Sequence, residues 1–264
     1  MTPKPLRIAQ ITDTHLYADP HGRLLGLDTR HCLEAVIDLA LDTHPPDLVV
    51  ASGDLAHDGT PAAYQHLRNS FSRLGVPVYC LPGNHDEAVA LRANLQNDYL
   101  RNSRSACIGG WLLLFLDSSV PGSEGGHLTE TELAALDKAL AANAELPALV
   151  WLHHQPVHVG SRWLDTMAVD NAEAFFDIID RYSKVRAIVW GHVHQTFEQK
   201  RNDVRLLASP STCIQFLPDS ENFAVDMTPP GYRWLELHAD GSLETGVVRL
   251  PAIPGVIDLS TRGY

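Results

Sequence analysis

Five apolar segments of this chain end in histidine, aspartate or asparagine, and this repeated pattern is the strongest constraint on its fold. In chain order they are 8–11 before Asp13 and His15, 49–53 before Asp54, 76–81 before Asn84 and His85, 148–152 before His153, and 187–191 before His192 and His194. Short continuous apolar runs are typical of strands buried on both faces of a parallel sheet. Because parallel strands end at one edge of their sheet, the pattern predicts an α/β fold with these side chains gathered at that edge.

The segments between the apolar runs carry helical patterns, as crossover connections between parallel strands require. Helices are predicted over 30–43, 61–74, 86–95, 130–143 and 172–182. In the first of them apolar residues recur every three or four positions, and the second begins with Thr60 as a cap and Pro61 at the first helical position. A hairpin is expected at 105–116, and from Thr196 onward the pattern changes to hairpins again. No repeat or linker divides the chain, so we expect one domain.

Composition excludes several classes of function. The net charge of the 264 residues is −12 with histidine neutral, so no basic surface is expected to bind a nucleic acid. The sequence has neither a signal-peptide pattern nor an apolar run long enough to span a bilayer, so we expect a cytoplasmic protein that binds no membrane. The four cysteines are widely spaced without a Cys-x-x-Cys pair, and we expect no disulfide.

The polar residues at the strand ends are of the types that bind metal ions. The seven predicted ligands are Asp13, His15, Asp54, Asn84, His153, His192 and His194. Seven oxygen and nitrogen ligands without a thiolate exceed the needs of one zinc site and suit two first-row ions, with Asp54 as the bridging carboxylate. Two ions about 3.5 to 4 Å apart can activate a shared water as hydroxide and hold a phosphoryl group. The pattern therefore predicts hydrolysis of a phosphoester by a metal-bound hydroxide.

His85 differs from these ligands because it lies between a predicted ligand, Asn84, and the carboxylate of Asp86. We expect Asp86 to hold one ring nitrogen of His85, so that the other nitrogen donates a proton to the leaving oxygen. His85 and Asp86 are thus the predicted catalytic pair. The predicted substrate contacts are Asn84, His85, His154 and His194. For His154, contact with phosphate and support of a neighbouring ligand are both compatible with the sequence.

Together these motifs resemble, in order, the five sequence blocks of the calcineurin-like metallophosphoesterases. The blocks are Asp13-x-His15, Gly53-Asp54, Gly83-Asn84-His85-Asp86, His153 and Gly191-His192-x-His194, within residues 8–194. The resemblance implies a four-layer αββα sandwich with mixed sheets and helices outside. It implies a first metal held by Asp13, His15, Asp54 and His194, and a second held by Asp54, Asn84, His153 and His192. In this fold we expect residues 196–264 of the single domain, 1–264, to complete the second sheet and form a C-terminal tail.

Other segments resemble the bacterial class III cyclic-AMP phosphodiesterases. They are 152–156, 210–216, 237–241 and the final Gly263-Tyr264. This resemblance implies a small cyclic nucleotide as partner, with 3′,5′-cyclic AMP hydrolysed to 5′-AMP. For the two metal ions iron or manganese is favoured, with zinc, cobalt or magnesium as alternatives.

Alternative readings stay open at this point. The same metals can serve hydrolysis of glycerophosphodiesters or phosphomonoesters, and some proteins of this fold are non-catalytic scaffolds. The presence of His85 and a complete ligand set disfavours the scaffold. Trp163, Phe216 and Phe223 either stack on a purine or fill the core. We assign no role to His57 or Asp117, and the sequence leaves the oligomeric state open.

Overall fold

Two six-stranded sheets form the centre of the computed structural model, which describes residues 4–96 and 100–260. The strands of the first sheet, in spatial order, are β16 (Leu243–Arg249), β15 (Gly231–Leu237), β1 (Leu6–Ile11), β4 (Leu48–Ser52), β5 (Val78–Leu81) and β6 (Leu100–Arg101). The strands of the second are β11 (Phe197–Arg201), β12 (Val204–Ala208), β10 (Val185–Trp190), β9 (Ala148–Trp151), β8 (Trp111–Phe115) and β7 (Ser105–Ile108). Each sheet has four neighbouring parallel strands, β1, β4, β5 and β6 in the first and β12, β10, β9 and β8 in the second.

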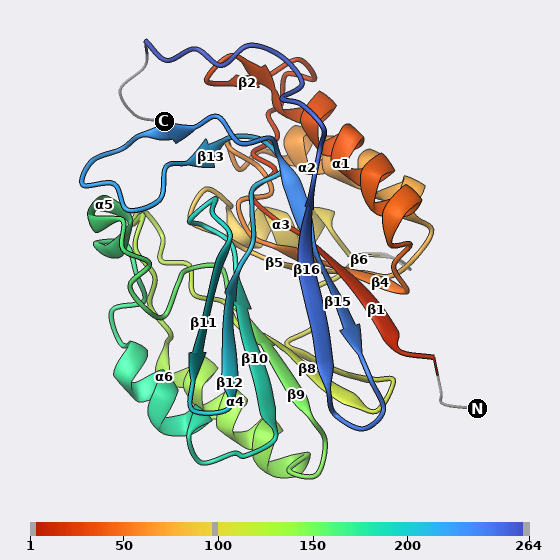
Figure 1. Ribbon diagram of the computed structural model, residues 1–264, viewed down its shortest axis with the longest axis vertical. Coiled ribbons are helices and arrows are strands. Elements are labelled where there is room, and N and C mark those ends of the chain that lie inside the picture. Colours follow the sequence, from red (N-terminus) through yellow and green to blue (C-terminus); the bar gives the residue numbers. More distant parts are fainter. Residues whose placement is uncertain (1–3, 97–99, 261–264) are drawn as a thin grey trace.

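Helices cover the outer face of each sheet (Figure 1). The helices on the first sheet are α1 (Thr29–Thr43), α2 (Pro61–Phe71) and α3 (Ala88–Asn94), and those on the second are α4 (Glu130–Ala142) and α6 (Ala172–Ile179). The predicted cap of α2 is present, since the side chain of Thr60 accepts a hydrogen bond from the amide of Ala63. Thr129 caps α4 in the same way, through the amide of Glu132. The order helix, sheet, sheet, helix confirms the predicted αββα sandwich.

The two sheets pack against each other through alternate residues of their central strands. Ile8, Val50, Leu113, Trp151 and Val189 are almost fully buried between the sheets. The residues that alternate with them face the helices, so both faces of these strands are apolar and buried. This packing fixes the two sets of parallel strands relative to each other, and with them the loops that follow these strands.

The segment after Thr196 differs in part from the expectation that it completes the second sheet. β11 and β12 lie in that sheet, but β15 and β16 extend the first sheet, where β15 pairs antiparallel with β1. The reason is that β15 buries apolar residues on both faces: Leu235 and Leu237 lie between the sheets, and Tyr232 packs in the core beneath α1. A hairpin pattern in sequence specifies that β15 and β16 pair, but not which sheet edge they cover.

Four smaller elements were not predicted. They are the strand β6, the hairpin of β2 (Arg23–Leu24) and β3 (Leu27–Asp28), the hairpin of β13 (Gln215–Phe216) and β14 (Val225–Asp226), and the short helix α5 (Arg162–Asp165). The predicted helix over 61–74 is α2 followed by a 3-10 turn, η1 (Ser72–Leu74), that ends at Gly75. Gly263-Tyr264 lies outside the described residues. Among the residues that are described, no helix is long and apolar enough to cross a membrane.

Candidate metal centre

The predicted ligands come from both sheets and converge at the ends of their parallel strands. Asp13 follows β1 and Asp54 follows β4 in the first sheet, whereas His153 and His194 follow β9 and β10 in the second. His194 Nε2 lies 3.3 Å from Asp13 Oδ1, and His153 Nε2 lies 3.3 Å from Asp54 Oδ2. These four side chains are fully buried. The predicted ligands therefore do not lie at the edge of one sheet. They lie where the strand ends of the two sheets meet, and we call this place the seam.

The remaining ligands complete two overlapping groups. His15 Nε2 lies 3.2 Å from His194 Nε2, and the oxygen of Asn84 lies 3.2 Å from His153 Nε2. Asp54 Oδ2 lies between the two groups, 3.8 Å from His15 Nε2 and 3.3 Å from His153 Nε2. His192 stands beside His153, with ring centroids 5.2 Å apart. Asp54 thus occupies the place expected of a bridging carboxylate.

The chemistry of these groups fits bound cations. Asp13 and Asp54 have no exposed surface, and the ion pairs they make in the described part of the chain are with histidines alone. Asp54 Oδ2 and both ring nitrogens of His192 are buried without a hydrogen-bond partner. Buried carboxylates and unpaired imidazole nitrogens destabilise the folded state unless a positive charge or a hydrogen-bond donor lies next to them. Two metal ions on these side chains would satisfy both requirements.

Backbone carbonyls orient two of the histidine rings. His153 Nδ1 donates a hydrogen bond to the carbonyl of Ser52 at 2.8 Å, and His194 Nδ1 donates to the carbonyl of Ile214 at 2.8 Å. Because a carbonyl only accepts, each Nδ1 carries a proton and each Nε2 faces the centre. Both rings are therefore oriented so that Nε2 can bind a metal once it carries no proton.

Burial and charge act in opposite directions on the pKa values of the centre. Burial lowers the pKa of His15 and of His192 far below the usual range, so both imidazoles are neutral. Burial also lowers the pKa of His153, but the nearby carboxylates of Asp54 and Asp13 outweigh it and raise this pKa to about 9. For Asp54, burial raises the pKa, and the surrounding histidines, His153 foremost, bring it well below its usual value. The carboxylate is thus ionised, as a metal ligand must be.

The backbone is strained where the ligands converge. Of eight non-glycine residues with positive φ in the described chain, five are predicted ligands: Asp13, His15, Asp54, His192 and His194. Left-handed backbone at a non-glycine residue costs on the order of 1–3 kcal/mol and clusters at functional sites. In this protein the strained turns reverse the chain directly after β1, β4 and β10, and so point the ligand side chains into the seam.

Glycines of the sequence motifs make room for the ligands. A Cβ on Gly53 would lie 2.2 Å from His153 Nδ1, and a Cβ on Gly83 would lie 2.2 Å from Asp54 Oδ1. A Cβ on Gly191 would lie 2.2 Å from Thr12 Oγ1 and 2.7 Å from Asp13 Oδ2. These contacts are far inside van der Waals distance, so any side chain at these positions would displace a ligand or its neighbour.

The contact expected between Asp86 and the ring of His85 is not formed. The carboxylate of Asp86 instead accepts hydrogen bonds from the amides of Leu55, Ala56 and Gly83 at 2.9 to 3.0 Å, and from the Tyr64 hydroxyl at 3.0 Å. Three backbone amides that point at one carboxylate engage it more strongly than one ring nitrogen would. Asp86 therefore fastens the loop after β4 to the turn after β5 and acts on His85 only through that turn.

Three further residues belong to this centre. His154 Nδ1 lies 2.8 Å from Ser118 Oγ, and its Nε2 is buried without a hydrogen-bond partner. His57, to which we assigned no role, lies with its Nδ1 3.2 Å from His15 Nδ1 and stacks on His85 with ring centroids 4.6 Å apart. A signal for His57 exists in its position three residues after Asp54, in the same loop. Nothing in the sequence around Ser118 marks it as a partner of His154.

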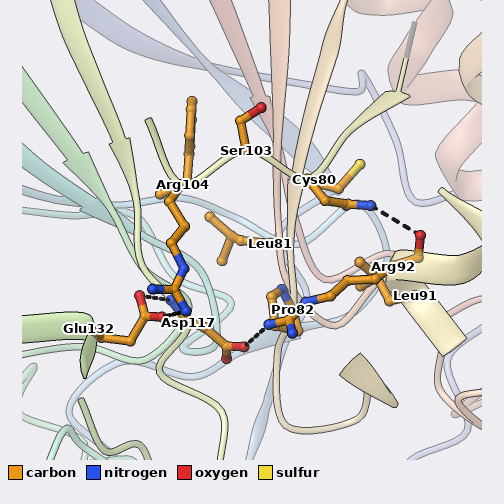
Figure 2. A pocket seen from close by; sticks show the side chains of 11 residues that line it. Cys80, Leu81, Pro82, Leu91, Arg92, Ser103, Arg104, Asp117 and Glu132 are labelled. Carbon is orange, nitrogen blue, oxygen red and sulfur yellow. Dashed lines mark hydrogen bonds and ion pairs between the residues drawn. The ribbon is translucent and has the colours of Figure 1, made fainter. Parts of the chain in front are cut away.

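Two cavities are candidates for the substrate site. One has a volume of about 380 Å³ and is lined in part by Leu81 and Pro82. Figure 2 shows the ion pairs at this cavity, Arg92 with Asp117 and Arg104 with Glu132. Its charged groups are already paired with each other, and none of the predicted ligands lines it. The other, of about 200 Å³, is bordered by Asn84, His85 and His192. The second cavity is therefore the one that opens onto the metal centre.

Comparison with known families decides what this centre is. Residues 6–196 match the model of the calcineurin-like phosphoesterases, which covers more than half of the chain and all seven predicted ligands. The chain belongs to the calcineurin-like phosphoesterases.

Curated relatives of this phosphoesterase match it over nearly its full length. It is 41% identical to the 3′,5′-cyclic adenosine monophosphate phosphodiesterase CpdA of Pseudomonas aeruginosa, over 97% of this chain and 94% of that protein. It is also 41% identical to CpdA of Escherichia coli K12, over 98% and 95% of the two chains. Among solved structures, a dimetal phosphatase from Danio rerio superimposes with a TM-score of 0.61 at 16% identity, over 94% of this chain and 99% of that one. At that identity the superposition supports the fold alone.

We expect Asp54→Ala to lose both metal ions from this phosphoesterase, because the Asp54 carboxylate lies between the two groups of ligands. Metal content per chain, measured by atomic emission on the purified variant, checks this. Asp203→Ala is the matched control, since the Asp203 side chain is 95% exposed, and it should keep the wild-type content. Two ions retained per chain in Asp54→Ala would show that Asp54 is not the bridge.

We expect Gly83→Ala to fold but to bind metal poorly, since its Cβ would meet Asp54 Oδ1 at 2.2 Å and the Asp54 amide nitrogen at 2.4 Å. Gly125→Ala is the control, because the nearest atom to a Cβ at Gly125 is 3.7 Å away. Thermal unfolding and metal titration of the two variants make the comparison. Equal metal affinity in Gly83→Ala and Gly125→Ala would mean that the turn at Gly83 accommodates a Cβ without moving Asp54.

Proposed function

We propose that this chain hydrolyses 3′,5′-cyclic AMP to 5′-AMP. The observation that carries the proposal is its 41% identity over 97% of its length with a relative named as a cyclic AMP phosphodiesterase. The buried cluster supports it, because the side chains at its centre are those that a phosphodiester hydrolase with two metal ions needs. A scaffold that has lost catalysis has no need to keep buried carboxylates, neutral imidazoles and strained turns together.

The ligands divide into two sets. The first ion would be held by Asp13, His15, Asp54 and His194, and the second by Asp54, Asn84, His153 and His192. When bound, the pair of ions supplies an activated water and the positive charge that stabilises the phosphoryl oxygens. Iron or manganese is our proposal for their identity, since these side chains offer oxygen and imidazole nitrogen but no thiolate.

His85 is the proposed general acid. Its amide donates a hydrogen bond to Asp54 Oδ1 at 2.9 Å, and its ring packs edge-on against His15 with centroids 5.0 Å apart. The ring also borders the cavity that opens onto the centre. As the water oxygen adds to phosphorus and the bond from phosphorus to O3′ breaks, His85 gives its proton to O3′. This is the group that turns a poor alkoxide leaving group into a hydroxyl.

His154 is the proposed donor to the phosphate. Ser118 Oγ accepts a hydrogen bond from the amide of His154 at 3.2 Å and lies 2.8 Å from its Nδ1. The hydroxyl can therefore donate its own hydrogen to Nδ1, which leaves the imidazole proton on Nε2. Burial, together with the neighbouring His153, lowers the pKa of His154 to about 3, so the ring is neutral. Its Nε2 then donates one hydrogen bond to a phosphoryl oxygen without adding charge, while Asn84 and His194 contact the phosphate from the ligand sets.

A panel of substrates tests the proposed function against its nearest rivals, a phosphodiesterase for glycerophosphodiesters and a phosphomonoesterase. We expect the metal-loaded protein to convert cyclic AMP to 5′-AMP with a higher kcat/KM than it shows on a glycerophosphodiester or a phosphomonoester. Cyclic GMP in the same panel measures base preference. Chelation followed by removal of the chelator should abolish activity, and readdition of metal should restore it. A higher kcat/KM on the glycerophosphodiester or the monoester would overturn the assignment.

We expect His85→Ala to keep its metal content and KM while kcat on cyclic AMP falls by about 10²-fold to 10⁴-fold, the range for a positioned acid. The reason is that O3′ then departs without a proton. A nitrophenyl phosphodiester, whose leaving group needs little protonation, should lose much less activity.

His21→Ala is the control for this prediction, because the His21 side chain is 84% exposed and lies outside the centre. It should match the wild type on both substrates. If His85→Ala loses equal activity on cyclic AMP and on the nitrophenyl ester, then His85 holds the phosphoryl oxygens and is not the acid.

A further inference from the structure

The cavity that opens onto the metal centre has a polar side and an apolar side. Asn84, His85 and His192 line the polar side, and the apolar lining comes from Trp163, Leu164, Met167 and Phe223. Trp163 and Leu164 belong to α5, and Phe223 lies between β13 and β14. A phosphate bound at the histidines would therefore place the rest of its molecule against aromatic and aliphatic side chains.

The aromatic side of the cavity is a rigid cluster joined to the metal centre. The ring of Trp163 packs edge-on against Phe216, with ring centroids 5.0 Å apart and an interplanar angle of 72°. It also packs edge-on against Phe223, with centroids 5.4 Å apart and an angle of 75°. Phe216 in turn stacks flat on the ring of His194, with centroids 4.2 Å apart and a 7° tilt. Edge-on packing fixes the ring planes of all three residues. These three aromatic residues form what we call the aromatic wall of the cavity. The position of the wall relative to His194 is thus set before a ligand binds.

Two glutamines hold the loops that carry this wall. Gln155 follows His153 and His154 in sequence, and its side-chain amide donates to the carbonyl of Leu164 at 2.6 Å. Gln195 follows His194, and its amide donates to Ser161 Oγ at 3.1 Å and to the carbonyl of Leu217 at 3.3 Å. Both glutamines are buried. Each loop is therefore tied to a residue next to a histidine of the centre, and Figure 1 shows α5 close to the loop of β13 and β14.

We propose that Trp163 and Phe223 form the binding pocket for the nucleobase of the substrate and determine the preference for nucleoside cyclic phosphates over other phosphodiesters. This inference rests on the proposed function and assigns the substrate's base to a place in the chain. A planar base suits the pocket because aromatic rings offer flat apolar faces, and stacking of a base on an aromatic side chain is worth about 1–3 kcal/mol by alanine substitution. The cavity of about 200 Å³ is of the size of a single heterocycle with part of its sugar.

The test compares cyclic AMP with its abasic analogue, the 3′,5′-cyclic phosphate of 1-deoxyribose. We expect Trp163→Ala to raise KM for cyclic AMP by about 5-fold to 100-fold, as loss of one base stack implies, with kcat and the KM of the abasic substrate unchanged. Trp163→Phe should restore most of the affinity. Trp234→Phe is the matched control, since Trp234 lies on β15 and stacks on His44 outside the cavity.

A second readout does not depend on catalysis. Equilibrium dialysis should show that 5′-AMP binds the wild-type holoprotein more tightly than ribose 5-phosphate does, and Trp163→Ala should remove this difference. Phe223→Ala provides a second variant in case Trp163→Ala folds poorly, with metal content and thermal unfolding measured for both. Equal losses on cyclic AMP and the abasic analogue, or equal binding of 5′-AMP and ribose 5-phosphate by the wild type, would overturn the pocket assignment. A wild type that binds 5′-AMP selectively but leaves cyclic AMP intact would keep the pocket and refute the proposed function.

Discussion

Two buried carboxylates, Asp13 and Asp54, are the constraint on which the rest of this structure depends. Both are fully buried at the seam of the two sheets, where their ion-pair partners in the described chain are histidines. Charge buried in this way is stable only with compensation nearby. The neutral rings of His15 and His192 and the carbonyl-bound rings of His153 and His194 surround the carboxylates with imidazole nitrogens, and a cation is the partner that would complete the site.

The fold accepts backbone strain to build this centre and supports it from several sides. Five predicted ligands have left-handed φ, and the turns that carry them are held by neighbours rather than by their own conformational preference. Asp86 binds three amides of two loops. Beneath the centre, Gln10 of β1 donates to Ser52 Oγ at 2.8 Å and to the carbonyl of Trp190 at 3.1 Å, so it joins the two sheets directly under the ligands. Catalytic geometry and sheet packing therefore depend on the same contacts.

The proposed base pocket would add specificity to the metal chemistry of the centre. The predicted ligands lie at strand ends, where sheet packing fixes them, whereas the aromatic side of the cavity lies on α5 and on the loop between β13 and β14. Loops can change without disturbing a rigid scaffold, and this is where substrate recognition commonly resides. Gln155 and Gln195 connect the two parts, because each follows a histidine of the centre and bonds a loop of the wall.

The sequence by itself determined the parallel strands, the crossover helices and the polar residues that end the strands, because apolar runs, caps and motif spacing are local properties of the chain. Family motifs added the two-sheet sandwich. Only the tertiary structure decided that the carboxylate of Asp86 binds loop amides, that β15 and β16 cover the edge of the first sheet, and that His57 and Ser118 contact the centre. The sequence left open whether Trp163 and Phe216 contact a ligand or fill the core. In the structure Trp163 lines the cavity, whereas Phe216 is buried and stacks on His194. The reason is physical: a hydrogen bond or a stacked ring depends on which distant segments packing brings together, and local sequence carries no record of those distances.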